Sequence, residues 1–160
     1  MSHNHTSVTL DKVSISRIEL LHPRLRAEAL ELLEAAQLVV EPGTVVRYTH
    51  TLRSFSEQDA LYAIGRTKPG TKVTNAKGGQ SIHNFGLALD FVIIRKGVAD
   101  WTVNTEWRAI ADLFKKAGWT WGGDWKSFKD YPHVEKTFGK SLAQLQALKK
   151  AQPKNIYVVF

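Results

Sequence analysis

The stretch SIHNFGLALDFVII, residues 81–94, contains the longest apolar run of the chain, and a single charge interrupts it. Residues 87–94 are apolar on both faces of a strand, which predicts a buried strand at the centre of a sheet. Asp90 is the exception. A buried carboxylate is costly without a partner, so Asp90 needs a cation, a set of hydrogen-bond donors or a metal ion beside it.

Two histidines are candidates for that partner. His83 lies seven residues before Asp90, and a turn at Gly86 can bring its imidazole to the carboxylate. A catalytic zinc ion needs three protein ligands and one open position. His133 follows Asp130 and precedes Glu135, so it lies among the acid–base groups that a hydrolytic site requires. The chain has no cysteine, which excludes thiolate ligands and a cysteine nucleophile. A structural ion pair at Asp90 is the alternative.

The remaining pattern mixes helices and strands without a regular alternation. Helices are expected at residues 23–39, from the Ser54 cap to 64, from the Asn104 cap to 117, and after the Ser141 cap. Strands are expected at residues 44–49, 87–94, 119–121, 133–135 and 156–160, with a long loop at 66–80. This order favours an α+β fold with helices packed on a mainly antiparallel sheet. We expect residues 1–12 to form a disordered leader and residues 13–160 a single domain.

Composition narrows the function classes. The 160 residues include 22 Lys and Arg against 15 Asp and Glu, a formal net charge of +7. Such a chain is attracted to polyanions, including nucleic acids and cell-wall acids. The basic residues form no run typical of nucleic-acid binding, so we expect no nucleic-acid partner. No apolar segment is long enough to insert into a membrane, and the first residues have no apolar core of a signal peptide.

The stretch around Asp90 resembles a known family. It fits the motif Ser-x-His-x-x-Gly-x-Ala-x-Asp of the zinc D-alanyl-D-alanine carboxypeptidases and L-alanyl-D-glutamate endopeptidases at every specified position. Residues 52–58, LRSFSEQ, resemble the arginine segment upstream in that family. Residues 121–125, WGGDW, and 130–133, DYPH, resemble its downstream end. The resemblance implies a hedgehog- or D-Ala-D-Ala-peptidase-like fold with a zinc site in a central cleft.

The same resemblance implies roles for individual residues. The zinc ligands would be His83, Asp90 and His133. Asp130 corresponds to the catalytic carboxylate, although some family members have glutamate there, and Glu135 is a rival base. Arg53 corresponds to the arginine that polarises the scissile carbonyl.

Four further residues are candidates around this site. Ser81 corresponds to the serine beside the substrate carboxylate. Gln58, in the arginine segment, and Trp125, in a loop near the site, are expected to contact substrate. Asp124 would either support a ligand histidine or cap a turn. Trp107, Trp119 and Trp121 are expected in the core.

The function implied is zinc-dependent hydrolysis of a peptide bond in the peptidoglycan stem peptide, as an L-alanyl-D-glutamate endopeptidase. A D-alanyl-D-alanine carboxypeptidase is the alternative, and a non-catalytic, zinc-stabilised wall-binding module is an alternative of another class. We expect a monomer whose partner is the peptidoglycan stem peptide. Without a visible signal peptide, it would reach the cell wall after release or non-classical export, or work in the cytoplasm.

Overall fold

A computed structural model describes residues 8–160 of the chain. Residues 1–7 of the expected disordered leader lie outside the described residues. Helix α1 (Lys12–Ile18) begins within that leader, and Asp11 caps it by accepting a hydrogen bond from the Ser14 backbone. The Asp11 carboxylate also pairs with Arg47 at 2.9 Å. These contacts place Asp11 with the folded domain.

The centre of the fold is a five-stranded sheet in which every pair of neighbouring strands is antiparallel. Strands β1 (Val45–His50), β2 (Ala88–Arg95), β5 (His133–Glu135) and β4 (Thr120–Trp121) follow one another in space, and β3 (Val98–Asp100) pairs with β2. The apolar run around Asp90 therefore forms the central strand. The α+β class with a mainly antiparallel sheet is confirmed.

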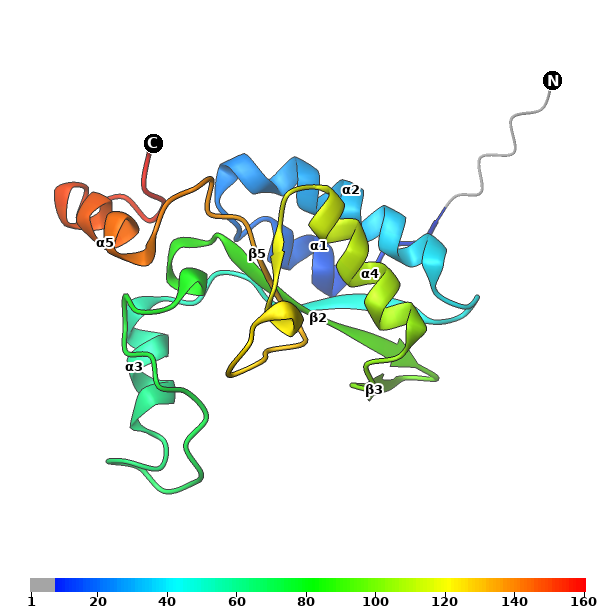
Figure 1. The fold of residues 1–160 in the computed structure, drawn as a ribbon, viewed down its shortest axis with the longest axis horizontal. Coiled ribbons are helices and arrows are strands. Elements are labelled where there is room, and N and C mark those ends of the chain that lie inside the picture. The colour runs from blue at the N-terminus through cyan, green and yellow to red at the C-terminus, as the bar shows by residue number, and fades with distance from the viewer. Residues whose placement is uncertain (1–7) are drawn as a thin grey trace.

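Helices α1, α2 (Pro23–Val39) and α4 (Thr105–Lys116) cover one face of the sheet (Figure 1). The buried side chains of β2 on that face alternate along the strand, as the pleat requires. Phe91 packs its ring 4.7 Å from the ring of Trp107 on α4. Asp90 is the next residue along the strand, so it points to the opposite face, which these helices leave open.

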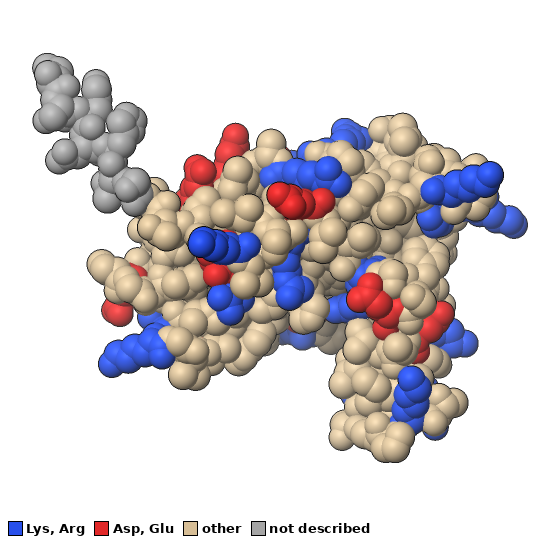
Figure 2. All heavy atoms as spheres, turned by 180° about the vertical axis from the view of Figure 1, so that it is seen from behind, with Lys and Arg blue, Asp and Glu red and all other residues tan. Residues whose placement is uncertain are grey.

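The open face is bordered by the remaining elements. Helix α3 (Phe55–Ala63) starts with a capping box between Ser54 and Glu57, and a loop of residues 64–81 follows it. A 3-10 helix, η1 (Ile82–Phe85), leads from this loop into β2. Helix α5 (Leu142–Ala151) lies on the same side of the molecule as α3 (Figure 1). In the space-filling view from behind, one lobe protrudes from the rest of the molecule (Figure 2).

Three local features differ from the sequence expectations. Residues 156–160 form no strand, because side chains satisfy part of their backbone: His22 Nε2 lies 2.8 Å from the Val158 carbonyl oxygen. Helix α1 and strand β3 have only 7 and 3 residues and were not expected.

No helix within residues 8–160 is long and apolar enough to cross a membrane.

Candidate metal centre and active site

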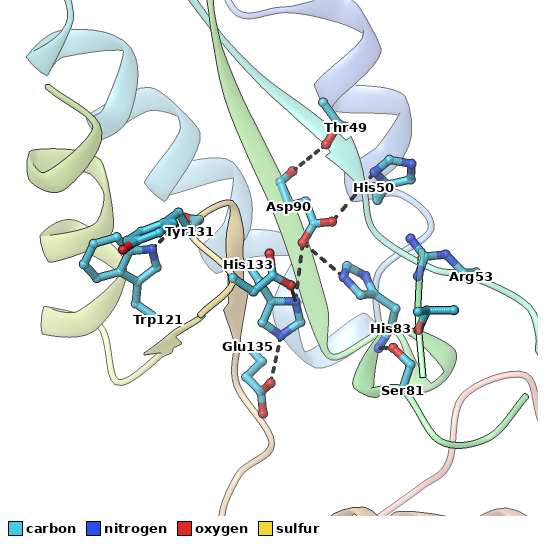
Figure 3. Close-up of polar contacts among 12 residues, drawn as sticks. Thr49, His50, Arg53, Ser81, His83, Asp90, Trp121, Tyr131, His133 and Glu135 are labelled. Carbon is cyan, nitrogen blue, oxygen red and sulfur yellow. Dashed lines mark hydrogen bonds and ion pairs between the residues drawn. The ribbon is translucent and has the colours of Figure 1, made fainter. Parts of the chain in front are cut away.

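Strand register places three polar side chains in a row on the open face. His50 at the end of β1 pairs with Asp90 of β2, and Asp90 pairs with His133 of β5. Because directly opposite residues of antiparallel strands point to the same face, the three side chains lie next to one another. Figure 3 shows Asp90 between the imidazoles that surround it. The sheet itself therefore assembles most of the site.

The fourth side chain, His83, comes from η1. Gly86 ends this short helix in the left-handed conformation, with φ of 69°, and its N–H donates to the His83 carbonyl. A side chain at Gly86 would also meet the backbone nitrogen of His22 at 2.8 Å. Glycine is required here on both counts. The turn brings His83 Nε2 to 3.1 Å from Asp90 Oδ1 (Figure 3).

His83, Asp90 and His133 form a cluster that could hold a metal ion. Their ligand atoms all lie within 4.8 Å of one another. The Oδ1 atom of Asp90 lies 3.4 Å from His133 Nδ1, in addition to its contact with His83. Two imidazole nitrogens and one carboxylate oxygen are ligands that suit zinc and similar divalent metals.

The other ring nitrogen of each histidine has its own partner. His83 Nδ1 lies 2.8 Å from the carbonyl oxygen of Thr51, and His133 Nε2 lies 2.8 Å from Glu135 Oε1. In a neutral ring, a nitrogen that donates to an oxygen leaves the opposite nitrogen as the acceptor, so each ring in its neutral form would present a lone pair to the cluster. Metal-binding histidines are typically oriented in this way.

The pKa values show how Asp90 is compensated. Burial raises the pKa of Asp90, but hydrogen bonds from His133 and His83 outweigh it and hold the pKa well below its usual range. Burial lowers the pKa of His133, but hydrogen bonds to Asp90 and Glu135 outweigh it and raise the pKa to about 9. The protein alone thus favours a proton on His133, at the position where a metal ion would supply the positive charge.

Asp130 lies beside the cluster without belonging to it. Its Oδ2 is 3.9 Å from His133 Nδ1, and 47% of its side chain is exposed. Burial and the nearby Asp90 charge raise its pKa. The turn that carries it depends on Gly122, because a Cβ there would lie 2.3 Å from the Asp130 carbonyl oxygen. The Asp130 N–H donates to the Gly122 carbonyl across this close approach.

Two tryptophans anchor the segment between Asp130 and His133. The indole N–H groups of Trp107 and Trp121 both donate to the Tyr131 carbonyl, at 3.0 and 2.7 Å. Both rings are buried, as is Trp119, so their expected place in the core is confirmed. The bonds to Tyr131 connect that core directly to the site.

Arg53 is held beside η1 through its backbone and side chain. The Arg53 backbone N–H donates to the His83 carbonyl. The Asn84 side-chain amide donates in turn to the Arg53 carbonyl at 3.0 Å. Its guanidinium donates to Gln58 Oε1 at 3.2 Å. Gln58 is buried, and its Nε2 donates to the Ala76 carbonyl at 2.9 Å. Gln58 therefore connects Arg53 to the loop after α3.

A cleft of about 870 Å³ is lined by the three candidate ligands and by Arg53, Gln58, Asp130 and Glu135. Two further candidates line the cleft: Ser81, which caps η1 by accepting from the His83 N–H, and Trp125. The Trp125 ring lies 5.3 Å from the His133 ring. Asp124 does not touch a ligand histidine, because it pairs with Lys115 at 2.7 Å. The expectation that it supports such a histidine is wrong.

His50 is the residue that sequence reasoning missed. Its Nδ1 lies 3.8 Å from Asp90 Oδ2, and its ring lines the cleft. Burial is the main reason that its pKa is lowered. In the sequence it merely follows a strand, and only the pairing of β1 with β2 places it opposite Asp90. The carbonyl of Thr51, which orients His83, carries no sequence signal.

Comparisons with known proteins assign the chain to a family. A family model described as D-alanyl-D-alanine carboxypeptidase matches residues 74–136. The peptidoglycan L-alanyl-D-glutamate endopeptidase CwlK of Bacillus subtilis (strain 168) is 44% identical, and the match covers 72% of each chain. The chain belongs to this family of peptidases.

Two further relatives extend the comparison. The peptidase is 27% identical to the L-alanyl-D-glutamate peptidase of Listeria phage A118, over 89% of this chain and 50% of the phage protein. It therefore spans half the length of that relative. It shares its fold with the crystal structure of the Serratia marcescens L-Ala D-Glu endopeptidase ChiX, with a TM-score of 0.56 and 24% identity over 86% of this chain and 96% of ChiX.

Proposed function

We propose that the peptidase is a zinc enzyme that hydrolyses the L-alanyl–D-glutamate bond of the peptidoglycan stem peptide. The observation that carries the proposal is the His83–Asp90–His133 cluster, which opens into a cleft beside Asp130. The 44% identity to an enzyme named for this bond supports the choice of substrate. We also propose that the peptidase acts as a monomer and meets this substrate at the cell wall.

Zinc is the metal that suits these three ligands best. His83 Nε2, Asp90 Oδ1 and His133 Nδ1 would hold it, and three protein ligands leave a position open toward the cleft. When bound, zinc supplies a Lewis acid that activates water and polarises the scissile carbonyl. His50, farther from Asp90 and on its other oxygen, would steady the carboxylate instead of binding the metal.

Asp130 is the proposed general base. A general base needs a pKa raised toward the working pH, and burial together with Asp90 raises the pKa of Asp130. Its carboxylate would take the proton from the attacking water and give it to the departing amine. Glu135 is a poorer candidate, because its Oε1 already accepts from His133 Nε2 at 2.8 Å. We assign Glu135 the role of orienting His133.

Arg53 would stabilise the oxygen on which negative charge develops. Its guanidinium lines the cleft, and Gln58 holds it there. Gln58 is buried with both ends of its amide bonded, so we propose that it positions Arg53 and the adjacent loop. Ser81 and Trp125 line the cleft and would contact the stem peptide.

The test is mass spectrometry of soluble peptidoglycan fragments incubated with the peptidase, with and without a chelator. We expect cleavage after L-alanine that the chelator abolishes and added zinc restores. Release of terminal D-alanine would favour the carboxypeptidase alternative, which the description of the matching family model also names. No product from a protein that still binds zinc would favour a non-catalytic wall-binding module.

A further inference from the structure

The positive charge of the peptidase is concentrated in two segments. Residues 55–80 and 140–160 together contain eight of the 22 basic side chains but only two of the 15 acidic ones. The rest of the chain contains the other fourteen basic and thirteen acidic side chains. The two segments therefore carry a net charge of +6 out of the formal +7 of the chain. We call them the basic lobe.

The two segments of the basic lobe touch each other. The Gln146 side chain on α5 donates to the Gly79 carbonyl at 2.8 Å. A hollow of about 390 Å³ lies at this junction, with Phe55 and Pro153 among its lining residues and Lys149 and Lys150 beside them. Figure 2 shows both basic and acidic side chains on the protruding part of the molecule. The two segments therefore meet at a partly apolar hollow.

The charges of the basic lobe are not neutralised within the protein. The ion pairs found among residues 8–160 use Lys or Arg only at positions 47, 95, 115 and 136, all outside the lobe. Among the described residues neither of its two acids forms an ion pair: Glu57 closes the capping box of α3, and Asp59 accepts from the Gly78 N–H at 2.7 Å. Lys68, Lys72 and Lys150 are exposed.

The basic lobe adjoins the active-site cleft through one short stretch of chain. Residues 73–76 and 80–83 line the cleft, and Gly78 and Gly79 between them line the hollow. A polymer with one stem peptide in the cleft could continue over this stretch onto the lobe. Unpaired lysines act on such a neighbour over the screening length of about 10 Å at 0.1 M salt.

We propose that the basic lobe is an exosite that binds carboxylates of the peptidoglycan strand next to the stem peptide being cut. The inference rests on the proposed function. Lysine ammonium groups are point charges that attract the carboxylates of such a strand, as they would attract a phosphate. The Phe55 and Pro153 surfaces of the hollow suit the aliphatic parts of a peptide. The apolar part of the hollow therefore favours a carboxylate-bearing peptide over a phosphodiester chain.

The exosite predicts different behaviour on large and small substrates. Insoluble peptidoglycan can fill the cleft and the lobe together, whereas a soluble fragment with one stem peptide fills the cleft alone. Binding the second region raises the local concentration of substrate at the first. Charge changes in the lobe should therefore alter the cleavage of insoluble peptidoglycan and leave that of the fragment unchanged.

The experiment compares two double variants with the same change in net charge. Lys72→Gln with Lys150→Gln removes one charge from each segment of the lobe. Lys12→Gln with Lys116→Gln removes two exposed charges outside it and serves as the control. On peptidoglycan stripped of phosphodiester polymers, at low salt, we expect the lobe variant to bind and cleave on the order of tenfold more weakly than the control. The difference should shrink as salt rises.

Each other result overturns part of the proposal. Equal behaviour of the two variants on stripped peptidoglycan would show that the lobe is not an exosite. A loss seen only on walls that keep their phosphodiester polymers would assign the surface to phosphate instead of carboxylate. Failure of the unmodified peptidase to cut the soluble fragment would contradict the proposed function, and binding to stripped peptidoglycan would still test the lobe.

Discussion

Two partly buried carboxylates of the peptidase are compensated in different ways. The side chain of Asp11, 9% exposed, receives two hydrogen bonds from the Arg47 guanidinium, at 3.0 and 2.9 Å, and two from Ser14. The side chain of Asp90, 19% exposed, is surrounded by imidazoles alone. An arginine is always charged, whereas the charge of an imidazole depends on a proton.

The difference separates a structural carboxylate from a functional one. Burial raises the pKa of Asp11, but hydrogen bonds from Arg47 and Ser14 outweigh it, and the pair needs nothing else. Hydrogen bonds from His133 and His83 outweigh burial and lower the pKa of Asp90, and the bonds of His133 to Asp90 and Glu135 raise its own pKa to about 9. A buried carboxylate whose neighbours are all imidazoles is a site that a divalent cation can complete.

The largest expected effect follows from removing the ligand. Asp90→Asn should abolish cleavage and stoichiometric zinc binding, because the amide removes the only negative charge among the three ligands. Asp11→Asn is the matched control: it should leave zinc affinity unchanged and lower the free energy of unfolding by about 1–2 kcal/mol. Zinc competition with a chromophoric chelator and urea unfolding measure the two quantities. Equal zinc affinity in both variants would break the comparison.

The next effect concerns catalysis without metal loss. Asp130→Asn should lower kcat by about 10²–10⁴-fold, because it removes the proton acceptor, while zinc stays bound. Asp124→Asn is the control, since Asp124 pairs with Lys115 away from the histidines. Steady-state cleavage and metal content, measured on the same preparations, check both. Normal cleavage by the Asp130 variant would point to another base.

A smaller effect tests how His133 is oriented. Glu135→Gln keeps the shape of the side chain but removes the charge that accepts from His133 Nε2, so zinc affinity should fall about 10–100-fold. Glu106→Gln, in the first turn of α4, serves as the control because Glu106 pairs with Arg95. A chelator competition assay measures the change. A Glu135 variant with unchanged affinity and no activity would make Glu135 the base.

The smallest effects are those of pH, and they have opposite signs in the two regions. Because the pKa of Asp11 is lowered in the folded protein, its ion pair stabilises the fold fully at pH values above the ordinary carboxyl pKa of about 4. That stabilisation is lost as the pH falls below this value. Because the pKa of His133 is raised in the protein without metal, its protonated ring stabilises the fold fully below about pH 6.5. That stabilisation is lost as the pH rises through about 9.

Metal binding near pH 7 should therefore release about one proton from His133. Calorimetry in buffers with different ionisation enthalpies counts that proton. Zinc binding with no proton release would show that His133 is already neutral in the protein alone.

Much of the fold could be predicted from residue patterns. The expected helix at residues 23–39 has the bounds of α2, because its apolar spacing and Pro23 define them. The apolar run around Asp90 is the central strand. The elements that were missed are short or take their stability from tertiary contacts. Helix α1 has a local N-cap in Asp11, but it is only 7 residues long, and the pairing of Asp11 with Arg47 is a tertiary contact that no local pattern shows.

The candidate site divides in the same way. Ligand types and a nearby carboxylate are visible as residues in the sequence, and the structure brings them into one cleft. The sequence could not predict roles that depend on the contacts of individual side-chain atoms. Glu135 and Asp130 are both carboxylates near His133, and only the 2.8 Å contact to Nε2 separates them. His50 enters the site only through the β1–β2 register.

The most direct test of the central idea, that a metal ion completes the Asp90 cluster, is a crystal structure of the zinc-loaded peptidase with anomalous data at the zinc edge. We expect one strong peak about 2.0–2.2 Å from His83 Nε2, Asp90 Oδ1 and His133 Nδ1, with Glu135 still bonded to His133 Nε2. A cluster without a peak, with His133 still within hydrogen-bond distance of Asp90, would show that a proton completes it instead and would contradict the account.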